Sequence, residues 1–439
     1  MTAPASPRRP LSLGVIFLTL LIDLIGFSII FPLGPDLIGY YLRTDGQSGI
    51  LGWLLAESDS LARALGKDHA FAAVLFGGVL FSLYSILQFV FSPFWGALSD
   101  RRGRRGVLLM TVAGTALGYL VWLLSGSFWL FVASRIVCGA FSGNLSVATA
   151  AVADVTTRQE RSRAMGLVGA AYGLGLVTGP MVGAAAAQIN LLARHPSLER
   201  FGINPFSVPA LVSLLLCAVN LAWVKRSFRE TLPESARTET REARLRNPIR
   251  AILNLENPSV RRANIAFFVY SLAFVAMETS LTFLAAERFG YSAGRNGILL
   301  GYLGICSIVT QGFIVRILLK KVDEVRVLAG GLVSTGVGLL VVGLGYQQWM
   351  MYAGLAIVAM GSGLVNPSIT GLISLYSGPA EQGRVLGIFR SLGSLSRAIT
   401  PILAGVVFFI YGSTSVFVAA AVLAAAAIAL SRGLPKAAR

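Results

Sequence analysis

The chain has 439 residues, of which 55% are hydrophobic and 13% charged, with a formal net charge of +17 and a mean hydropathy of +0.72. Ordinary soluble domains carry about 25% charged residues, so this composition excludes a string of soluble domains. The three cysteines fall in apolar runs and the two histidines lie far apart, which indicates neither a disulfide framework nor a metal site.

Twelve apolar runs are long enough to cross a bilayer, for which a helix needs roughly 20 residues. In chain order they span about 11–34, 70–98, 107–125, 128–154, 163–188, 206–225, 262–286, 295–318, 327–346, 349–377, 383–409 and 412–431. Glycine punctuates these runs and strict alternation is rare, which favours helices over a membrane barrel. We therefore predict an all-α membrane protein with twelve transmembrane helices.

Most of the 37 Lys and Arg residues fall in ends and loops that share one side of the membrane. By the positive-inside rule this side is the cytoplasm, and both termini are predicted to lie there. Because the basic residues are joined to no soluble fold, we expect no nucleic-acid partner. Arginine greatly outnumbers lysine, which is typical of a GC-rich bacterial genome and suggests the bacterial inner membrane.

The first run carries an acid, Asp23, within the sequence LIDLIGFSII. The outer loop that follows is placed at 35–69. Its apolar residues, from Ile50 to Leu65, recur at helical spacing, which predicts a helix lying on the membrane surface.

Between the second and third runs the sequence reads GALSDRRGRRGVLL, starting at Gly96. Anchoring on the cytoplasmic side explains Arg101, Arg104 and Arg105, but it does not explain Asp100. This spacing is more specific than anchoring requires.

The fourth and fifth runs contain RIVCGAFSG, with Arg135, and GLGLVTGPMVG, with Gly175, Gly179, Pro180 and Gly183. Glycines four residues apart are common at helix interfaces in membranes. Pro180 removes a backbone hydrogen bond and predicts a kink. No strand precedes the glycines, so they do not indicate a dinucleotide site.

The second half of the chain repeats the first. The segment from Glu381 to Pro401 matches the segment from Glu160 to Pro180, and Gln88 pairs with Gln311 and Asn144 with Asn366 at nearly the same offset. Asp23 pairs with Glu278 once the first outer loop is treated as about 32 residues longer. We therefore predict an N-terminal six-helix bundle at 1–224, a cytoplasmic linker at 225–261 and a C-terminal six-helix bundle at 262–439. Parallel repeats around a central site are typical of one class of secondary transporter.

These motifs resemble those of the major facilitator superfamily. The similarity is strongest to the twelve-helix drug–proton antiporters and, within them, to the tetracycline-transporter-like branch. The resemblance implies that Gly96, Asp100, Arg101, Arg104 and Arg105 close a cytoplasmic gate. It also implies that the fourth-run motif belongs to proton-coupled members, and that the Gly175–Gly183 stretch is the antiporter motif of helix five.

Two departures separate this chain from the bacterial tetracycline exporters. Those exporters have a histidine in helix eight, whereas no apolar run here contains one, and they have small residues where this chain has Arg390 and Arg397. Tetracycline itself is therefore not implied, and the proton route must differ.

Five ionisable residues lie well inside the runs: Asp23, Arg135, Glu278, Arg390 and Arg397. Each costs about 2.5–3.5 kcal/mol at a helix centre on insertion scales, so each needs a partner or a water-filled cavity. We interpret Asp23 and Glu278 as proton carriers and Arg135 as the group that tunes them. The alternative for Asp23 is a permanent structural pair with an arginine, for example Arg135.

The three arginines outnumber the two acids, so the interior suits organic anions or zwitterions better than polycations. We assign substrate binding to six residues: Arg397, Arg390, Gln88, Gln311, Asn144 and Asn366. Two alternatives stay open, namely that Arg390 reaches the cytoplasmic surface and that the amides only join helices.

The sequence thus predicts a proton-coupled antiporter that exports small amphipathic organic molecules by alternating access, and not an enzyme. We expect a monomer in the bilayer that uses the proton gradient and no cofactor. A lipid or lysolipid flippase on the same fold is an alternative, and a membrane sensor that no longer transports is a more distant one.

Overall fold

The computed structural model describes residues 13–45, 49–64, 70–156, 161–232, 255–377 and 382–435. In this part of the chain, twelve helical segments are long and apolar enough to cross a membrane, which confirms the predicted fold class. A backbone in lipid must satisfy its own hydrogen bonds, and a helix does so within one segment.

The first crossing is longer than the sequence indicated. It consists of α1 (Leu13–Ser28), the short 3-10 turn η1 (Phe31–Leu33) and α2 (Gly34–Thr44). Prolines at the start of η1 and of α2 interrupt the hydrogen-bond ladder without ending the crossing, so the loop predicted to begin at residue 35 begins after Thr44. The loop contains the predicted helix, α3 (Gly49–Ala64), whose Trp53 is 65% exposed.

The other crossings of the N-terminal half are α4 (Ala70–Arg102), α5 (Arg104–Leu123), α6 (Phe128–Ala140) continued by α7 (Asn144–Val155), α8 (Arg161–Ala187) and α10 (Ser207–Ser227). Two short elements, α9 (Leu191–Arg194) and η2 (Pro196–Phe201), connect α8 to α10. Much of the predicted linker, at residues 233–254, lies outside the described residues.

The C-terminal half consists of α12 (Pro258–Phe289), α13 (Ala293–Val309), α15 (Glu324–Leu344), α16 (Gln348–Tyr376), α17 (Gln382–Tyr411) and α18 (Ser413–Ser431). The crossing that starts with α13 continues through a π-helical turn, η4 (Thr310–Ile314), into α14 (Val315–Lys321). Such turns are rare and occur often at functional sites.

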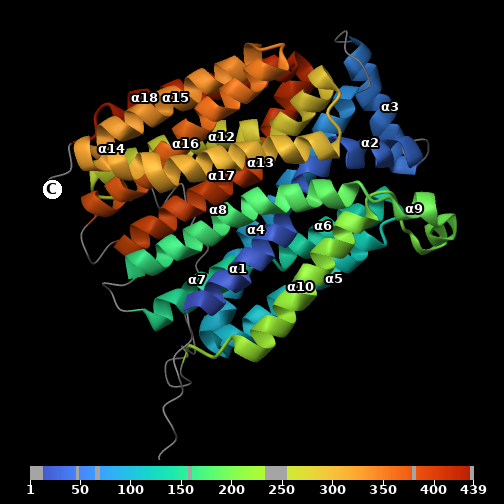
Figure 1. The fold of residues 1–439 in the computed structure, drawn as a ribbon, viewed down its shortest axis with the longest axis horizontal. Coiled ribbons are helices and arrows are strands. Elements are labelled where there is room, and N and C mark those ends of the chain that lie inside the picture. Colours follow the sequence, from blue (N-terminus) through green and yellow to red (C-terminus); the bar gives the residue numbers. More distant parts are fainter. Residues whose placement is uncertain are drawn as a thin grey trace, which may run out of the picture.

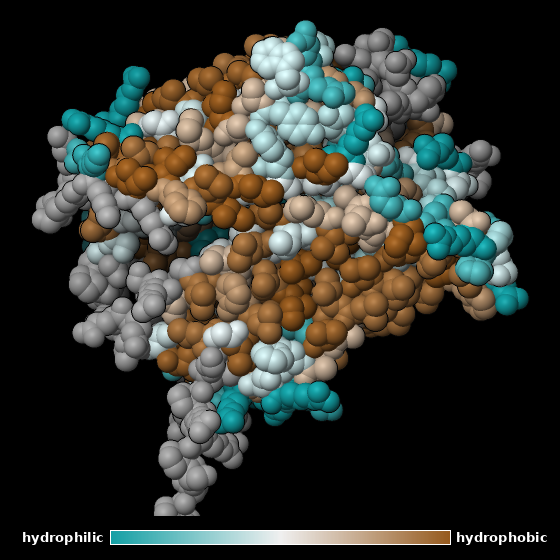
Figure 2. All heavy atoms as spheres, viewed as in Figure 1, coloured by the Kyte–Doolittle hydropathy of each residue, from teal (hydrophilic) through white to brown (hydrophobic). Residues whose placement is uncertain are grey.

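The two halves lie side by side in Figure 1, the first in blue and green and the second in yellow to red. We call the end with α14, the C-terminus and the α4–α5 turn the linker end, and the end with α3 and α9 the loop end (Figure 1). Apolar residues cover the visible face between the two ends, and hydrophilic residues gather toward the ends, as a membrane protein requires (Figure 2).

The halves pack tightly against each other toward the loop end. On α4, Gly78 abuts the backbone of Pro401 on α17, so that no side chain would fit between them. On α13, Gly297 and Gly304 face Ala184 and Val177 of α8 in the same way. Glycine permits such close helix contacts.

The same helices separate toward the linker end. Four glycines there have no other atom within 4 Å of the position a β-carbon would take: Gly169 and Gly173 on α8, Gly312 on η4 and Gly387 on α17. The ribbons of the two halves also diverge in this direction (Figure 1). The halves are thus closely packed at the loop end and more widely separated at the linker end.

Candidate functional site

The structure joins two residues that the sequence marked for different roles. Asn144, at the start of α7, donates a hydrogen bond from Nδ2 to Oδ1 of Asp23 on α1 over 2.7 Å. Asn144 is 3% exposed, whereas Asp23 is only half-buried. The Asn144 Oδ1 atom has no hydrogen-bond partner among the described residues, so this amide retains an unused acceptor.

Arg135 on α6 makes no ion pair with Asp23 in the part of the chain that the structure describes. Its guanidinium lies over the Trp122 ring at 4.8 Å and over the Phe131 ring at 5.3 Å, and it donates from Nε to Ser134 Oγ over 3.2 Å. Aromatic faces attract a desolvated cation. The side chain is 7% exposed, yet Nη2 has no partner among the described residues.

In the C-terminal half, Glu278 on α12 and Arg397 on α17 interact electrostatically. Neither makes an ion pair or hydrogen bond to another described residue, and both are half-buried. Charged side chains inside a membrane crossing need either a partner or water. We conclude that Glu278 and Arg397 border a space that water can enter.

Tyr270 is a residue of this region that sequence reasoning missed. It lies on α12, is 2% exposed and interacts electrostatically with Glu278, but its hydroxyl has no partner among the described residues. The two residues are eight positions apart and so lie on roughly one helix face. The eight-residue spacing from Glu278 is the sequence signal that could have identified Tyr270.

The other predicted substrate-binding residues are more dispersed. Gln311 lies on η4 and Asn366 on α16, both exposed, and Gln88 is half-buried on α4. None of these three side-chain amides bonds to another described residue. Arg390 is an exposed residue near the linker end of α17.

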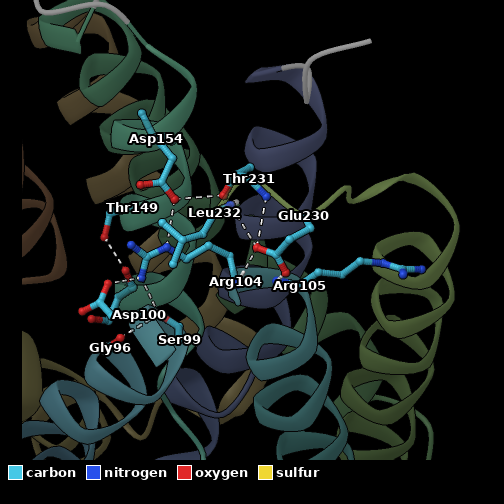
Figure 3. A network of polar contacts seen from close by, with 12 residues as sticks. Gly96, Ser99, Asp100, Arg104, Arg105, Thr149, Asp154, Glu230, Thr231 and Leu232 are labelled. Carbon is cyan, nitrogen blue, oxygen red and sulfur yellow. Dashed lines mark hydrogen bonds and ion pairs between the residues drawn. The ribbon is translucent and has the colours of Figure 1, made fainter. Parts of the chain in front are cut away.

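The predicted gate residues form a connected polar network at the linker end (Figure 3). Arg104, the first residue of α5, donates from Nε to Asp154 Oδ2 of α7 over 2.9 Å and from Nη1 to Ser99 Oγ over 2.6 Å. It also pairs with Asp100 at 2.6 Å. The Arg104 side chain is 7% exposed and that of Asp100 is 53% exposed, so Arg104 is the centre of the network.

The network extends to Glu230, which lies in the predicted cytoplasmic linker. Its carboxylate accepts the backbone N–H groups of Arg104 and Arg105 over 2.8 and 3.1 Å, at the start of α5. A carboxylate there satisfies free N–H groups and complements the helix dipole. Gly103, with φ of +93°, gives the carboxylate room, because a β-carbon would clash with it.

Among the described residues, all members of this network, including Asp154 and Thr231, belong to the N-terminal half or the start of the linker (Figure 3). Gly96 contributes its carbonyl oxygen to Ser99 Oγ, and Arg101 is exposed. The signal that could have revealed Glu230 is an arginine-rich helix start with no acidic residue of its own.

The glycines of the predicted helix-five motif bring α8 against α1. A β-carbon on Gly175 would lie 2.5 Å from Leu24 Cβ, and Gly179 and Gly183 abut Ser28 and the Ile29 carbonyl even more closely. Ser28 Oγ also lies 2.9 Å from the Gly175 carbonyl oxygen and donates to it. Pro180 lies inside α8, and its carbonyl faces Gly297 of the other half.

The arrangement offers titratable carboxyl groups in both halves, a cationic group beside one of them, and an opening at one end of the molecule. It offers no group of three or more metal-ligating side chains within the described residues. Such a site can bind and release small charged molecules.

Comparison with known proteins gives a consistent result. A family model described as Major Facilitator Superfamily matches residues 16–324 and 313–438. Major facilitator superfamily domain-containing protein 10 of Mus musculus is 31% identical over 434 residues, covering 94% of this chain and 90% of the relative. Tetracycline resistance protein, class C, of Escherichia coli is 28% identical over 406 residues, covering 92% and 91%.

A solved structure resembles the whole molecule. The crystal structure of the human organic anion transporter MFSD10 (TETRAN) superposes with a TM-score of 0.74 at 30% identity, covering 96% of this chain and 98% of that chain.

Proposed function

This chain belongs to the Major Facilitator Superfamily, and we propose that it exchanges protons for amphipathic organic anions or zwitterions by alternating access. It is a multi-pass membrane transporter and not an enzyme. The observation that carries the proposal is the pair of half-buried charges, Glu278 and Arg397, which have no direct partner among the described residues.

The proton role rests on the carboxyl groups of Asp23 and Glu278. A carboxylic acid releases its proton more readily when water or a cation surrounds it, and holds the proton when its surroundings become dry. If the two halves rock, each carboxyl group passes between such surroundings. The hydrogen bond from Asn144 to Asp23 gives this acid a partner that does not neutralise its charge.

The substrate class rests on the cations. Arg397 has no ion pair among described residues, and Arg135 is buried with a free Nη2 atom, so the interior can accept negative charge. A structural relative at 30% identity is described as an organic anion transporter, which agrees with this assignment. The tetracycline resistance relatives support transport of small organic molecules more generally.

We further propose that the linker end faces the cytoplasm, in line with the positive charge of that side. In this orientation the structure is open to the cytoplasm. Closing that side would bring the C-terminal half against the network of Asp100 and Arg104, which would then act as the cytoplasmic gate.

The test is transport by the purified full chain in proteoliposomes. Carboxyfluorescein, a fluorescent organic anion, is added outside vesicles whose interior has the higher proton concentration. The outward flow of protons should drive uptake of the anion, and collapse of the gradient with an uncoupler should stop it. Uptake of the cation ethidium should be much slower. Uptake of carboxyfluorescein that ignores the gradient would contradict proton coupling, and a preference for ethidium would contradict the substrate class.

A lipid or lysolipid flippase is a second candidate, and one observation favours it. The linker-end parts of α8 and of the crossing that starts with α13 leave Gly173 and Gly312 facing open space. A lateral opening between these two crossings would admit an acyl chain. Translocation of a fluorescent lysophospholipid, detected by dithionite quenching in the same proteoliposomes, would support this candidate over the first.

A further inference from the structure

One carboxylate joins the two halves at the loop end. Asp36, in the first turn of α2, accepts a hydrogen bond over 2.6 Å from the backbone N–H of Ala293, the first residue of α13. Between described residues, one other hydrogen bond crosses the halves, from the Ile402 N–H on α17 to Ser82 Oγ on α4. Asp36 thus supplies the charged hydrogen bond between the halves in this part of the chain.

The start of α13 depends on this bond. The first N–H groups of a helix have no partner within it, and a side chain just before the helix usually satisfies one of them. Ser292 occupies that position, but its hydroxyl makes no capping bond. The cap therefore comes from the other half, and Gln188, which follows α8, also abuts this turn at Gly294.

Two other carboxylates cap helices in the same way without joining the halves. Asp45 accepts the N–H of Phe128, the first residue of α6, over 2.6 Å, and Glu230 caps α5. Both contacts lie within the N-terminal half or the start of the linker. They have the chemistry of the Asp36 contact, but a rocking motion of the halves would not break them.

The loop-end contact around Asp36 is also tightly packed. Phe283 of α12, 4% exposed, fits against Gly34 on α2 and Gly77 on α4 of the other half. Opening this end would therefore have to withdraw the Phe283 ring and break the Asp36 bond together.

We propose that Asp36 is a gating residue of the loop end, whose carboxylate holds α13 against α2 and so favours the conformation open at the linker end. The inference rests on the alternating-access function proposed above. Asp36 acts on the position of α13 and need not touch the substrate. Removing its carboxylate should favour opening at the loop end.

The experiment measures this opening directly. Spin labels at Glu199→Cys and Gln348→Cys, both exposed at the loop end on different halves, report the separation of the halves by double electron–electron resonance. The full chain is used in lipid nanodiscs, in a background lacking Cys138, Cys217 and Cys306. Asp36→Ala should raise the ratio of long to short distances roughly tenfold, the effect of losing one charge-assisted hydrogen bond.

Asp45→Ala is the matched control, since it removes an equivalent cap within one half and should leave the distance ratio unchanged. If Asp36→Ala does not fold, Asp36→Asn keeps the acceptor and the shape, and should give a smaller shift in the same direction. An unchanged ratio in the folded Asp36 variants, or an equal shift in Asp45→Ala, would overturn the proposal. Absence of carboxyfluorescein uptake by the wild-type chain would instead count against the transport function.

Discussion

Asn144 Nδ2 and Asp23 Oδ1 lie 2.7 Å apart, so that an amide on α7, and no arginine, contacts the acid in the first crossing. This geometry leaves the negative charge of Asp23 without a counter-ion among the described residues. A carboxyl group held in this way can be ionised or neutral without breaking a salt bridge, which suits a proton carrier.

We expect Asp23→Asn to reduce proton-driven carboxyfluorescein uptake at least tenfold, because the side chain no longer titrates. The folded state should survive, since an asparagine oxygen can still accept the Asn144 N–H. Uptake is measured in inside-out vesicles with an imposed pH gradient. Retention of the full gradient-driven signal would exclude Asp23 from coupling.

Asn144→Ala and Asn220→Ala separate coupling from packing. Each removes an asparagine that bonds to α1, since Asn220 Nδ2 donates to the Thr19 carbonyl over 3.1 Å. Both variants should lower the melting temperature, because each removes a buried hydrogen bond worth about 1 kcal/mol. Only Asn144→Ala should also lower the number of protons exchanged per anion, and equal coupling in the two variants would contradict this role.

For Arg397 we expect the neutral variant Arg397→Gln to bind carboxyfluorescein roughly 10- to 100-fold more weakly, because a charge-assisted hydrogen bond contributes about 1.5–3 kcal/mol. Arg397→Lys should recover part of the affinity, since it keeps the charge without the planar fork. Fluorescence anisotropy measures the affinity. Arg200→Gln, at an exposed loop-end position, is the control, and an equal loss there would refute a specific site.

In the gate network, neutralising Arg104 should destabilise the protein far more than neutralising Asp100. Arg104→Gln removes a buried cation that two carboxylates contact, and it should destabilise the protein by about 3 kcal/mol. Asp100→Asn removes an exposed partner four residues away, which is typically worth about 0.3–0.5 kcal/mol. Melting temperatures in detergent provide the comparison. Similar losses in both variants would show that Arg104 is not the centre of the network.

Gly77→Ala should favour opening at the loop end, because its β-carbon would lie 2.5 Å from the Phe283 ring. Gly34→Ala is the matched control, since its β-carbon would meet the same ring at an ordinary 3.5 Å. The spin-label pair described above measures both variants. A larger change in the Gly34 variant than in the Gly77 variant would contradict this account of the packing.

The sequence was sufficient for the twelve crossings because a lipid-embedded helix shows itself in composition alone. It also marked Asp23 and Asn144 separately, but their contact depends on how α1 and α7 rotate about their axes, which no local pattern encodes. The predicted end of the first crossing at residue 34 came too early, because Pro32 and Pro35 start new helical turns there and do not end the crossing.

Glu230 was missed for a related reason. An acidic residue in a charged linker looks like solvated surface until the fold brings it to the start of α5. Which end of the molecule is open was equally inaccessible, since the glycines that face open space and those that touch the other half are identical as residues.

The contact between Gly78 and Pro401 lies far from the linker end of α17. About 19 residues separate Pro401 from Gln382, so this part of α17 is about 30 Å long at 1.5 Å per residue, and it packs on α12 of its own half through Phe389 and Phe267. Tilting the C-terminal half about this contact by one degree displaces the end of α17 by about half an ångström, so a few degrees decide whether a small molecule can pass. The separation of the halves at the linker end is thus set at the far end of the helix, by how closely the backbones of Gly78 and Pro401 approach each other.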